Sequence, residues 1–415
     1  MQQEKNLSSL KNYIIVTVAY WAFTLSDGAL RMLVLLHFHG IGYNAFQVAM
    51  LFLLYEFFGM VSNLVGGWVA ARLGIRSTLL TGLALQVIAL MMLSMLDPGW
   101  VISVSITYVM IAQALSGIAK DLTKMSAKSG VRLVSGEAGG QLYHWVAVLT
   151  GSKNALKGAG FFVGGMLLTF AGFVGSLWIL SAMLMAALLY AMALPTAVGR
   201  VKTKPRFSSL FSKSPLINSL SWARLFLFGS RDAWFAVGLP LYLVNGQGWT
   251  AAQVGSFMAA WVIGYGIVQA STSWLFRDRT PGAGTSLAWI SALTLLTLVI
   301  VIMLNTGLDA LTVILAGLTA FAALFAVNSA IHSFLVLAYS DSDNVTLNVG
   351  FYYMANAAGR LIGTLLSGAA YYWQGINGCL ATATMMLVVS AVLSLRLRVI
   401  ESRQPDQFDQ VSRRN

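Results

Sequence analysis

The stretch WILSAMLMAALLYAMAL (residues 178–194) is apolar on every face, and LTLLTLVIVIML (293–304) has the same character. Such runs suit a helix that crosses a bilayer core of about 30 Å, which needs ~20 apolar residues. A membrane β-barrel would instead alternate apolar and polar side chains. The whole chain agrees, because 58% of its 415 residues are hydrophobic, 10% are charged and the mean hydropathy is +0.75. The sequence therefore predicts an all-α integral membrane protein.

Windows of that length predict twelve transmembrane helices. Their approximate ranges are 13–38, 46–70, 78–96, 101–119, 143–170, 175–195, 216–243, 250–275, 285–304, 309–337, 347–372 and 376–396. The polar N-terminal stretch MQQEKNLSSLKN leads into a full-length span with no small-residue cleavage site, so no removable signal peptide is expected. The single cysteine, Cys379, excludes an intrachain disulfide and a multi-thiol metal site.

The basic residues follow the positive-inside rule. All but six of the 26 Lys and Arg residues fall on one set of alternating connections, and the other set contains none. Both termini are therefore predicted to be cytoplasmic. The net charge of +12 reflects this topology, and no nucleic-acid partner is expected, because the charges are scattered over short loops.

The chain also contains an internal repeat. The segments GYNAFQV (42–48) and GWTAAQV (248–254) each join the first and second helices of a half, and the segment 200–215 between the halves is basic, with two prolines. We predict an N-terminal half (1–199), a cytoplasmic linker (200–215) and a C-terminal half (216–415) with a short cytoplasmic tail. Two six-helix repeats resemble the plan of the major facilitator superfamily, in which the substrate site lies near the midplane between the halves.

One predicted loop resembles that superfamily imperfectly. The sequence GGWVAARLGIR supplies Gly67, Arg72, Gly74 and Arg76 of its gating-loop pattern between the second and third helices. However, Ala71 occupies the position where an aspartate is usual, which puts the gating salt bridge in doubt. The alternative is a basic cytoplasmic turn with no gating role.

Six cations lie inside predicted spans with three acids. The cations are Arg31, Lys153, Lys157, Arg224, Arg231 and Arg360, and the acids are Asp27, Glu56 and Asp232. A cation at the centre of a membrane helix costs roughly 2.5–3.5 kcal/mol, so the excess needs a reason, and an anionic substrate supplies one. Lys153 and Lys157 repel each other at i and i+4, which favours an anion between them. Arg224 and Arg231 share a face, although Arg224 alternatively snorkels to the membrane surface. Arginine and lysine together suit a small, multiply charged oxyanion.

The three acids have two interpretations, structural ion pairing or proton coupling. Asp27 and Arg31 are spaced to neutralise each other within one helix. Glu56 has no partner in its own helix, which makes it the best isolated candidate for a titrating group. Asp232 faces poorly toward adjacent Arg231, so its partner is expected on another helix. Asn328 and His332, at i and i+4, either line the substrate cavity or bond a neighbouring helix.

Four stretches resemble the organoarsenical efflux permease (ArsJ) family of the major facilitator superfamily. They are YWAFTLSDGALRMLVLLHFH (20–39), QALSGIAKDLTKMSAKS (113–129), LTGSKNALKGAGFF (149–162) and RLFLFGSRDAWFAVGLPLYL (224–243). The resemblance implies export of 1-arseno-3-phosphoglycerate across the bacterial cytoplasmic (inner) membrane. Glyceraldehyde-3-phosphate dehydrogenase makes this ester from arsenate and would be a functional partner. The resemblance supplies no residue-level site.

Two alternatives remain open at this point. The first keeps the fold but changes the cargo to another organic phosphate or a sugar phosphate. The second is a membrane enzyme that binds a phosphorylated substrate through the same cations. The sequence offers no nucleophile with a base, no nucleotide-binding loop and no metal-ligand cluster, since its four histidines are scattered. We therefore expect no catalytic residues, no metal and no cofactor.

Overall fold

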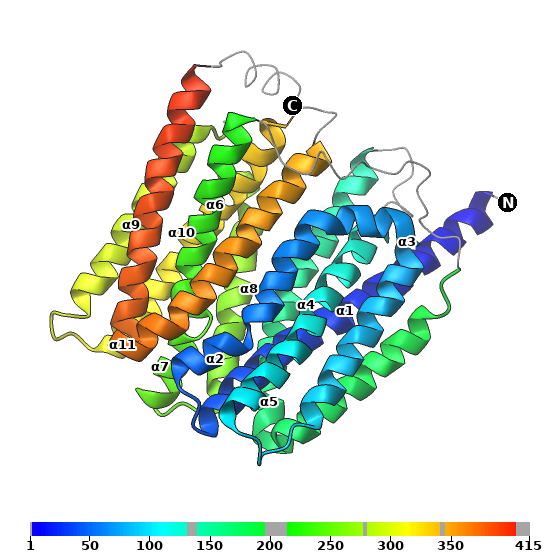
Figure 1. Ribbon diagram of the computed structural model, residues 1–415. Helices are drawn as coiled ribbons and strands as arrows, with labels where there is room; N and C mark the ends of the chain where they lie inside the picture. The colour runs from blue at the N-terminus through cyan, green and yellow to red at the C-terminus, as the bar shows by residue number, and fades with distance from the viewer. Residues whose placement is uncertain (1, 131–138, 196–213, 277–279, 341–344, 404–415) are drawn as a thin grey trace. The chain divides into compact units, whose positions relative to one another are not determined.

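A computed structural model describes residues 2–130, 139–195, 214–276, 280–340 and 345–403. Every regular element within these ranges is a helix (Figure 1). The helices are α1 (Gln2–Gly40), α2 (Ala45–Leu51), α3 (Leu53–Ser94), α4 (Ile102–Gly130), α5 (Gly139–Ala191), α6 (Pro215–Phe235), α7 (Gly238–Asn245), α8 (Ala251–Leu275), α9 (Ala283–Met303), α10 (Ala310–Ala338) and α11 (Val345–Ser402). Most of the predicted linker 200–215 lies outside the described residues.

Three long helices are interrupted at glycines with positive φ. These are Gly74 in α3 (φ 78°), Gly172 in α5 (φ 65°) and Gly375 in α11 (φ 60°). Glycine adopts this conformation without the steric penalty that a Cβ would bring. Each break separates two helical arms where the sequence predicted two successive spans.

The described helices account for the predicted spans. Nine helical segments within these residues are long and apolar enough to cross a membrane. Two of the nine, 152–191 and 348–402, contain the breaks at Gly172 and Gly375 and are long enough for two crossings each. The remaining crossing is α6 with α7, whose hydropathy is lowered by Arg224, Arg231 and Asp232. The prediction of twelve helices is confirmed.

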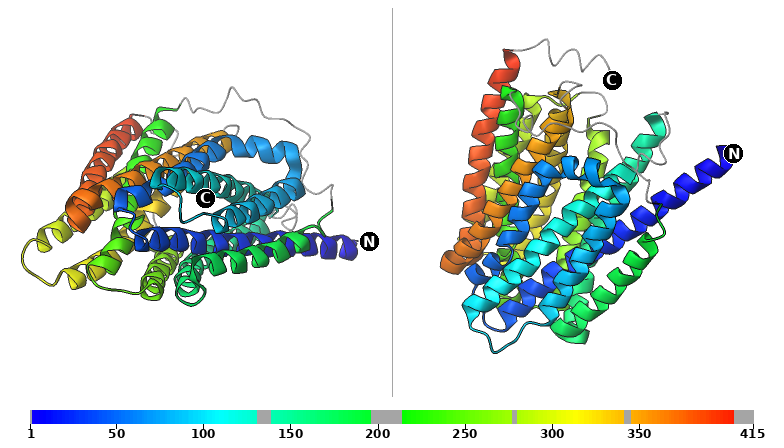
Figure 2. Two further views of the ribbon diagram at one scale, coloured as in Figure 1. Left: turned by 60° about the horizontal axis from the view of Figure 1, so that its bottom comes forward. Right: turned by 45° about the vertical axis from the view of Figure 1, so that its right-hand side comes forward.

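The chain forms two compact units. Unit 1 consists of residues 1–42, 51–207 and 249–263, and unit 2 of residues 43–50, 208–248 and 264–415. In unit 1, α1 packs along α5, and α3 packs along α4. In unit 2, α11 packs along α6 and α9, as Figures 1 and 2 both show.

Glycines allow the helices of unit 1 to approach closely beside its charged residues. A Cβ on Gly28 of α1 would lie 2.7 Å from the carbonyl oxygen of Lys157 on α5. A Cβ on Gly117 of α4 would lie 2.6 Å from the carbonyl oxygen of Tyr55 on α3. Contacts this short exclude any larger residue without a backbone shift. Gly28 therefore sets the distance between α1 and α5, and Gly117 sets the distance between α3 and α4.

The repeated segments fold alike. The backbone N–H of Asn44 donates to Oε1 of Gln47 at 2.9 Å, and the N–H of Gln47 donates to Oδ1 of Asn44 at 2.9 Å. The N–H of Thr250 likewise donates to Oε1 of Gln253 at 2.8 Å, and the N–H of Gln253 donates to Oγ1 of Thr250 at 3.3 Å. Each segment is thus a reciprocal capping box that starts a helix.

Candidate substrate and proton sites

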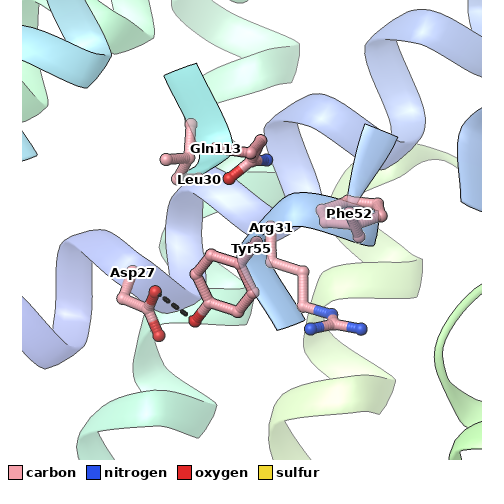
Figure 3. Close-up of a pocket in the computed structure, with 6 residues that line it drawn as sticks. All are labelled: Asp27, Leu30, Arg31, Phe52, Tyr55 and Gln113. Carbon is pink, nitrogen blue, oxygen red and sulfur yellow. Dashed lines mark hydrogen bonds between the residues drawn. The ribbon is translucent and has the colours of Figure 1, made fainter. Parts of the chain in front are cut away.

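A small pocket in unit 1 has a volume of ≈ 10 Å³ (Figure 3). Its lining comes from α1, α3, α4 and the residue between α2 and α3, namely Asp27, Leu30, Arg31, Phe52, Tyr55 and Gln113. Pockets for drug-sized ligands usually measure about 300–1,000 Å³. This pocket is far smaller and has room for about one water molecule beside the charged groups that line it.

The buried arginine at the pocket pairs with an acid on another helix. Nη1 of Arg31 lies 3.0 Å from Oε1 of Glu56, whose residue is 1% exposed. The guanidinium also lies 5.0 Å from the centre of the Phe52 ring. The packing of α1 against α3 gives Glu56 this partner on another helix, which supports the ion-pairing interpretation of Glu56.

Asp27 has a different kind of partner. Its Oδ1 accepts a hydrogen bond of 2.6 Å from the hydroxyl of Tyr55 on α3, as Figure 3 shows. The predicted neutralisation of Asp27 by Arg31 is wrong, since Arg31 turns to Glu56. Asp27 is half-buried, and its described partner is a neutral hydroxyl rather than a cation.

Three further charged residues belong to this region of unit 1 and were missed from the sequence. Helix α4 continues to Gly130, so Lys120, Asp121 and Lys124 lie on it rather than in a loop. Nζ of Lys124 contacts Oδ1 of Asp121 at 2.5 Å and donates to Oδ1 of Asn63 at 2.7 Å. Asp121 is 1% exposed. The uninterrupted run IAKDLTKMSAK, with no Gly or Pro before Gly130, was the signal that the helix continues.

The two lysines of α5 differ in burial. Lys153 is exposed, whereas Lys157 is half-buried and its Nζ lies 5.7 Å from the centre of the Phe161 ring. The turn of α5 that contains Ser152 is bonded to α1, because Nε1 of Trp21 donates to Oγ of Ser152 at 3.0 Å. The lysines therefore sit beside the close contact between α1 and α5.

In unit 2, two arginines share one carboxylate. Nε of Arg231 donates to Oδ1 of Asp232 at 2.7 Å, and Nε of Arg360 on α11 donates to Oδ2 of Asp232 at 3.2 Å. The expectation of a partner on another helix is confirmed by Arg360, but the expectation that Arg231 faces away is wrong. The long Arg231 side chain folds back to the neighbouring carboxylate and lies 5.0 Å from the Phe228 ring centre and 5.5 Å from that of Phe325.

Arg224 is buried among neutral groups. Its Nε donates to Oδ1 of Asn356 at 3.0 Å, and its Nη1 donates to the carbonyl of Ser329 at 3.1 Å. The guanidinium lies 3.9 Å from the ring centre of Phe228 and 5.0 Å from that of Tyr352. Arg224 is 4% exposed, so the snorkelling interpretation is wrong. These contacts to neutral oxygens and aromatic faces hold the cation without cancelling its charge.

The polar residues of α10 divide between two neighbours. Nδ2 of Asn328 donates to the carbonyl of Trp289 at 3.0 Å, and Nε2 of His332 lies 3.1 Å from Oγ of Ser286. Both residues are fully buried, which supports the interpretation that they bond α9. Ser329 instead faces Arg224 and accepts hydrogen bonds at Oγ from Tyr265 and Gln269, at 3.2 and 3.3 Å. Sequence reasoning missed Ser329, Tyr265, Gln269 and Asn356, because uncharged polar residues are common in membrane helices.

The predicted gating loop is part of α3. Gly74 provides its break, and Nη2 of Arg76 donates to the carbonyl of Met192 at the end of α5, at 3.3 Å. The backbone of Gly67 and Arg72 is helical, and the side chain of Arg72 lies outside the described part of the chain. Arg76 thus contacts the residue that directly follows α5.

These observations define a helical, multi-pass membrane protein with charged groups in the cores of both units. The family model of the Major Facilitator Superfamily matches residues 13–339, so the chain belongs to this superfamily of transporters. A comparison with curated protein sequences gave no match.

Solved structures of transporters share the fold at low sequence identity. One, described as "Structural insights into substrate recognition in proton dependent oligopeptide transporters", has a TM-score of 0.71 and 12% identity, and covers 97% of this chain and 100% of its own. A POT family transporter in complex with a thioalcohol-conjugated peptide has a TM-score of 0.70 and 14% identity, with 94% and 96% coverage. Another, with 5-aminolevulinic acid, has a TM-score of 0.70 and 15% identity, again with 94% and 96% coverage.

Proposed function

We propose that this transporter exports an organic arsenate and phosphate ester, 1-arseno-3-phosphoglycerate, across the bacterial cytoplasmic membrane in exchange for protons. Arsenate resistance would follow, because glyceraldehyde-3-phosphate dehydrogenase converts arsenate into the exported ester. The cargo and the outward direction rest on the sequence resemblance described above. The charge of the cargo rests on the contacts within the two units.

The observation that carries the proposal is the environment of Arg224. A buried cation is costly unless something offsets its desolvation. The described partners of Arg224 are an amide oxygen, a carbonyl and two aromatic rings, all of them neutral. A phosphate or arsenate oxygen accepts charge-assisted hydrogen bonds from a planar guanidinium better than from any other side chain. Arg224 therefore supports an anionic cargo.

Asp232 suggests how the anion is released. Arg231 and Arg360 share this one carboxylate, which leaves a net positive charge on the three groups. An incoming anion would compete with Asp232 for the same N–H donors. The return of the Asp232 carboxylate to both guanidiniums would displace the cargo. Asp27 in unit 1 is the acid that would carry the proton, whereas Glu56 would have a structural role with Arg31.

The first test compares an arsenic-sensitive bacterium carrying the transporter alone, the dehydrogenase alone, or both, with intracellular arsenic quantified. We expect resistance and low intracellular arsenic when both are present. Arg224→Met should abolish that resistance at equal membrane abundance. The matched control is Lys11→Met, which removes an exposed cation near the start of the first span.

The possible outcomes separate the cargo from the anion site. Protection by the transporter alone would contradict export of the dehydrogenase product. A lack of protection from the pair, despite confirmed expression, would return the cargo to the wider class of organic phosphates. Full resistance with Arg224→Met would overturn the anion site itself.

A further inference from the structure

Tyr55 contacts three different groups in the core of unit 1. Its hydroxyl donates to Asp27 on α1 at 2.6 Å. Its ring lies under the ammonium group of Lys120 on α4, with Nζ 3.9 Å from the ring centre. Its backbone packs against Gly117 of α4, where a Cβ would approach the Tyr55 carbonyl oxygen to 2.6 Å. One residue of α3 therefore joins an acid on α1 to a cation on α4.

Two of these contacts, the hydrogen bond to Asp27 and the cation–π contact with Lys120, depend on each other through the phenol. A cation over the face of an aromatic ring is attracted to its π electrons. The same positive charge makes the hydroxyl a stronger donor, and a carboxylate is a stronger acceptor than a carboxylic acid. The bond between Tyr55 and Asp27 is thus strongest when Asp27 is ionised and Lys120 lies on the ring.

We propose that Tyr55 is a positioning residue that transmits the charge state of Asp27 to Lys120 and so to the packing of α3 against α4. The inference deepens the proton coupling put forward above and rests on Asp27 taking up a proton. A proton from solution adds to the Asp27 carboxylate, and no other covalent bond changes. The Tyr55 hydroxyl then loses its charged acceptor, the ring becomes free to turn, and Lys120 loses its position over it.

Other charged and titratable groups surround Asp27 and shape its response. Arg31 lies one turn away on α1, but it is bound to Glu56. The segment of α8 in unit 1, residues 251–263, has no titratable side chain. Other groups on the packed helices include Tyr20 on α1, Lys120, Asp121 and Lys124 on α4, and Lys153 and Lys157 on α5. Among these, Lys120 is the one whose described contact runs through Tyr55.

The experiment needs no cargo, so its outcome is independent of what the protein transports. Amide hydrogen exchange of residues 115–126 is measured on the full-length protein in lipid nanodiscs across a range of pH, after correction for the intrinsic pH dependence of exchange. We expect exchange in the wild type to rise about tenfold as Asp27 becomes protonated, the change that corresponds to losing one charge-assisted hydrogen bond. Asp27→Asn and Tyr55→Phe should both give the higher rate at every pH.

Variants of the neighbouring lysines separate coupling from loss of packing. Lys120→Met should remove the pH step, and Lys120→Arg should restore it, because arginine also binds aromatic faces. Lys124→Met is the matched control one turn away. It breaks the contacts with Asp121 and Asn63, so it should raise exchange at every pH while keeping the step.

Two results would overturn the proposal. One is a pH step that persists in Tyr55→Phe or in Lys120→Met. The other is a wild type with no step in α4 although infrared difference spectra detect protonation of Asp27 through a carboxyl band that Asp27→Asn removes. If transport failed for the proposed ester while the step was present, the cargo would be wrong and the role of Tyr55 would stand.

Discussion

The two units treat their buried arginines in opposite ways. In unit 1, Arg31 has an acid of its own, Glu56, and Asp27 is left to a tyrosine hydroxyl. In unit 2, Asp232 serves both Arg231 and Arg360, and Arg224 has neutral described partners. Buried acids without cations suit proton binding, and buried cations without acids suit anion binding. The difference suggests a division of labour within a repeated fold.

Among the variants that test this difference between the units, those at Arg224 should have the largest effect on transport. Arg224→Met should lower transport roughly 100-fold, because a charge-assisted contact to the anion is worth about 3 kcal/mol. Arg224→Lys keeps the charge but not the planar set of donors that reaches both Asn356 and Ser329, so we expect roughly a tenfold loss. Arsenate resistance and the rate of arsenic efflux measure both. Wild-type efflux from Arg224→Met would remove the distinction between the units.

Asp27 and Asp232 should differ in the kind of defect that they cause. Everted membrane vesicles with radiolabelled 3-phosphoglycerate, a stable analogue of the ester, separate pH-driven accumulation from exchange of labelled for unlabelled probe. Asp27→Asn should abolish accumulation, a loss of at least about tenfold, and preserve exchange, because only proton binding is removed. Asp232→Asn should lower both, because no carboxylate remains to displace the anion from Arg231 and Arg360.

Glu56→Gln provides the internal reference for that experiment. It removes an acid in unit 1 that is already paired, so any effect should follow protein stability rather than pH. Equal loss of exchange and accumulation in Asp27→Asn would contradict the assignment of proton binding to Asp27.

The ion pair between Arg31 and Glu56 should affect the free energy of unfolding rather than transport. Glu56→Gln leaves Arg31 buried and unpaired, which costs about 3–5 kcal/mol of unfolding free energy. Replacing both members, Arg31→Met with Glu56→Leu, should recover most of that loss, because no uncompensated charge remains. Thermal unfolding in detergent, followed by tryptophan fluorescence, gives the comparison. A double variant as unstable as Glu56→Gln would mean that the pair also orders its surroundings.

The capping boxes should give the smallest effects and the most similar ones. Asn44→Ala and Thr250→Ala each remove one side-chain acceptor from the start of a helix, which costs about 1 kcal/mol. Asn44→Ala should cost slightly more, since its bond is 2.9 Å and that of Thr250 is 3.3 Å. The same unfolding assay applies. Stability losses that differ several-fold would show that the two capping boxes contribute unequally to the stability of the protein.

The sequence predicted the fold well because the bilayer requires a continuous run of apolar residues for each crossing, and such a run is a local feature of the sequence. Apolar runs, basic connections and the repeated segment were enough to define twelve helices and their approximate ends. The end of α4 was placed too early, since Lys120, Asp121 and Lys124 were read as a loop although they lie on the helix. Charged residues mark the end of this span poorly, because α3 provides partners for them. Asn63 accepts a hydrogen bond from Lys124, and the Tyr55 ring contacts Lys120.

The candidate site was predictable as a set of residues but not as a set of contacts. The intramembrane charges could be named from the sequence, and the structure places Arg224, Arg231 and Arg360 in unit 2. Their partners depend on how each helix is rotated about its axis, which one sequence does not encode locally. For this reason Arg31 was matched with Asp27, four residues away, although it pairs with Glu56 across the helix interface.

The breaks at Gly172 and Gly375 have a consequence for how the chain enters the membrane. Each joins two long apolar arms through a turn too short to leave a hydrophilic loop. Because the turn adds no hydrophilic segment, we expect the two arms to enter the lipid together as a hairpin during synthesis. Stalled translation just after either glycine should therefore leave the preceding arm poorly anchored, whereas a stall after residues 97–101, where a true loop follows α3, should not.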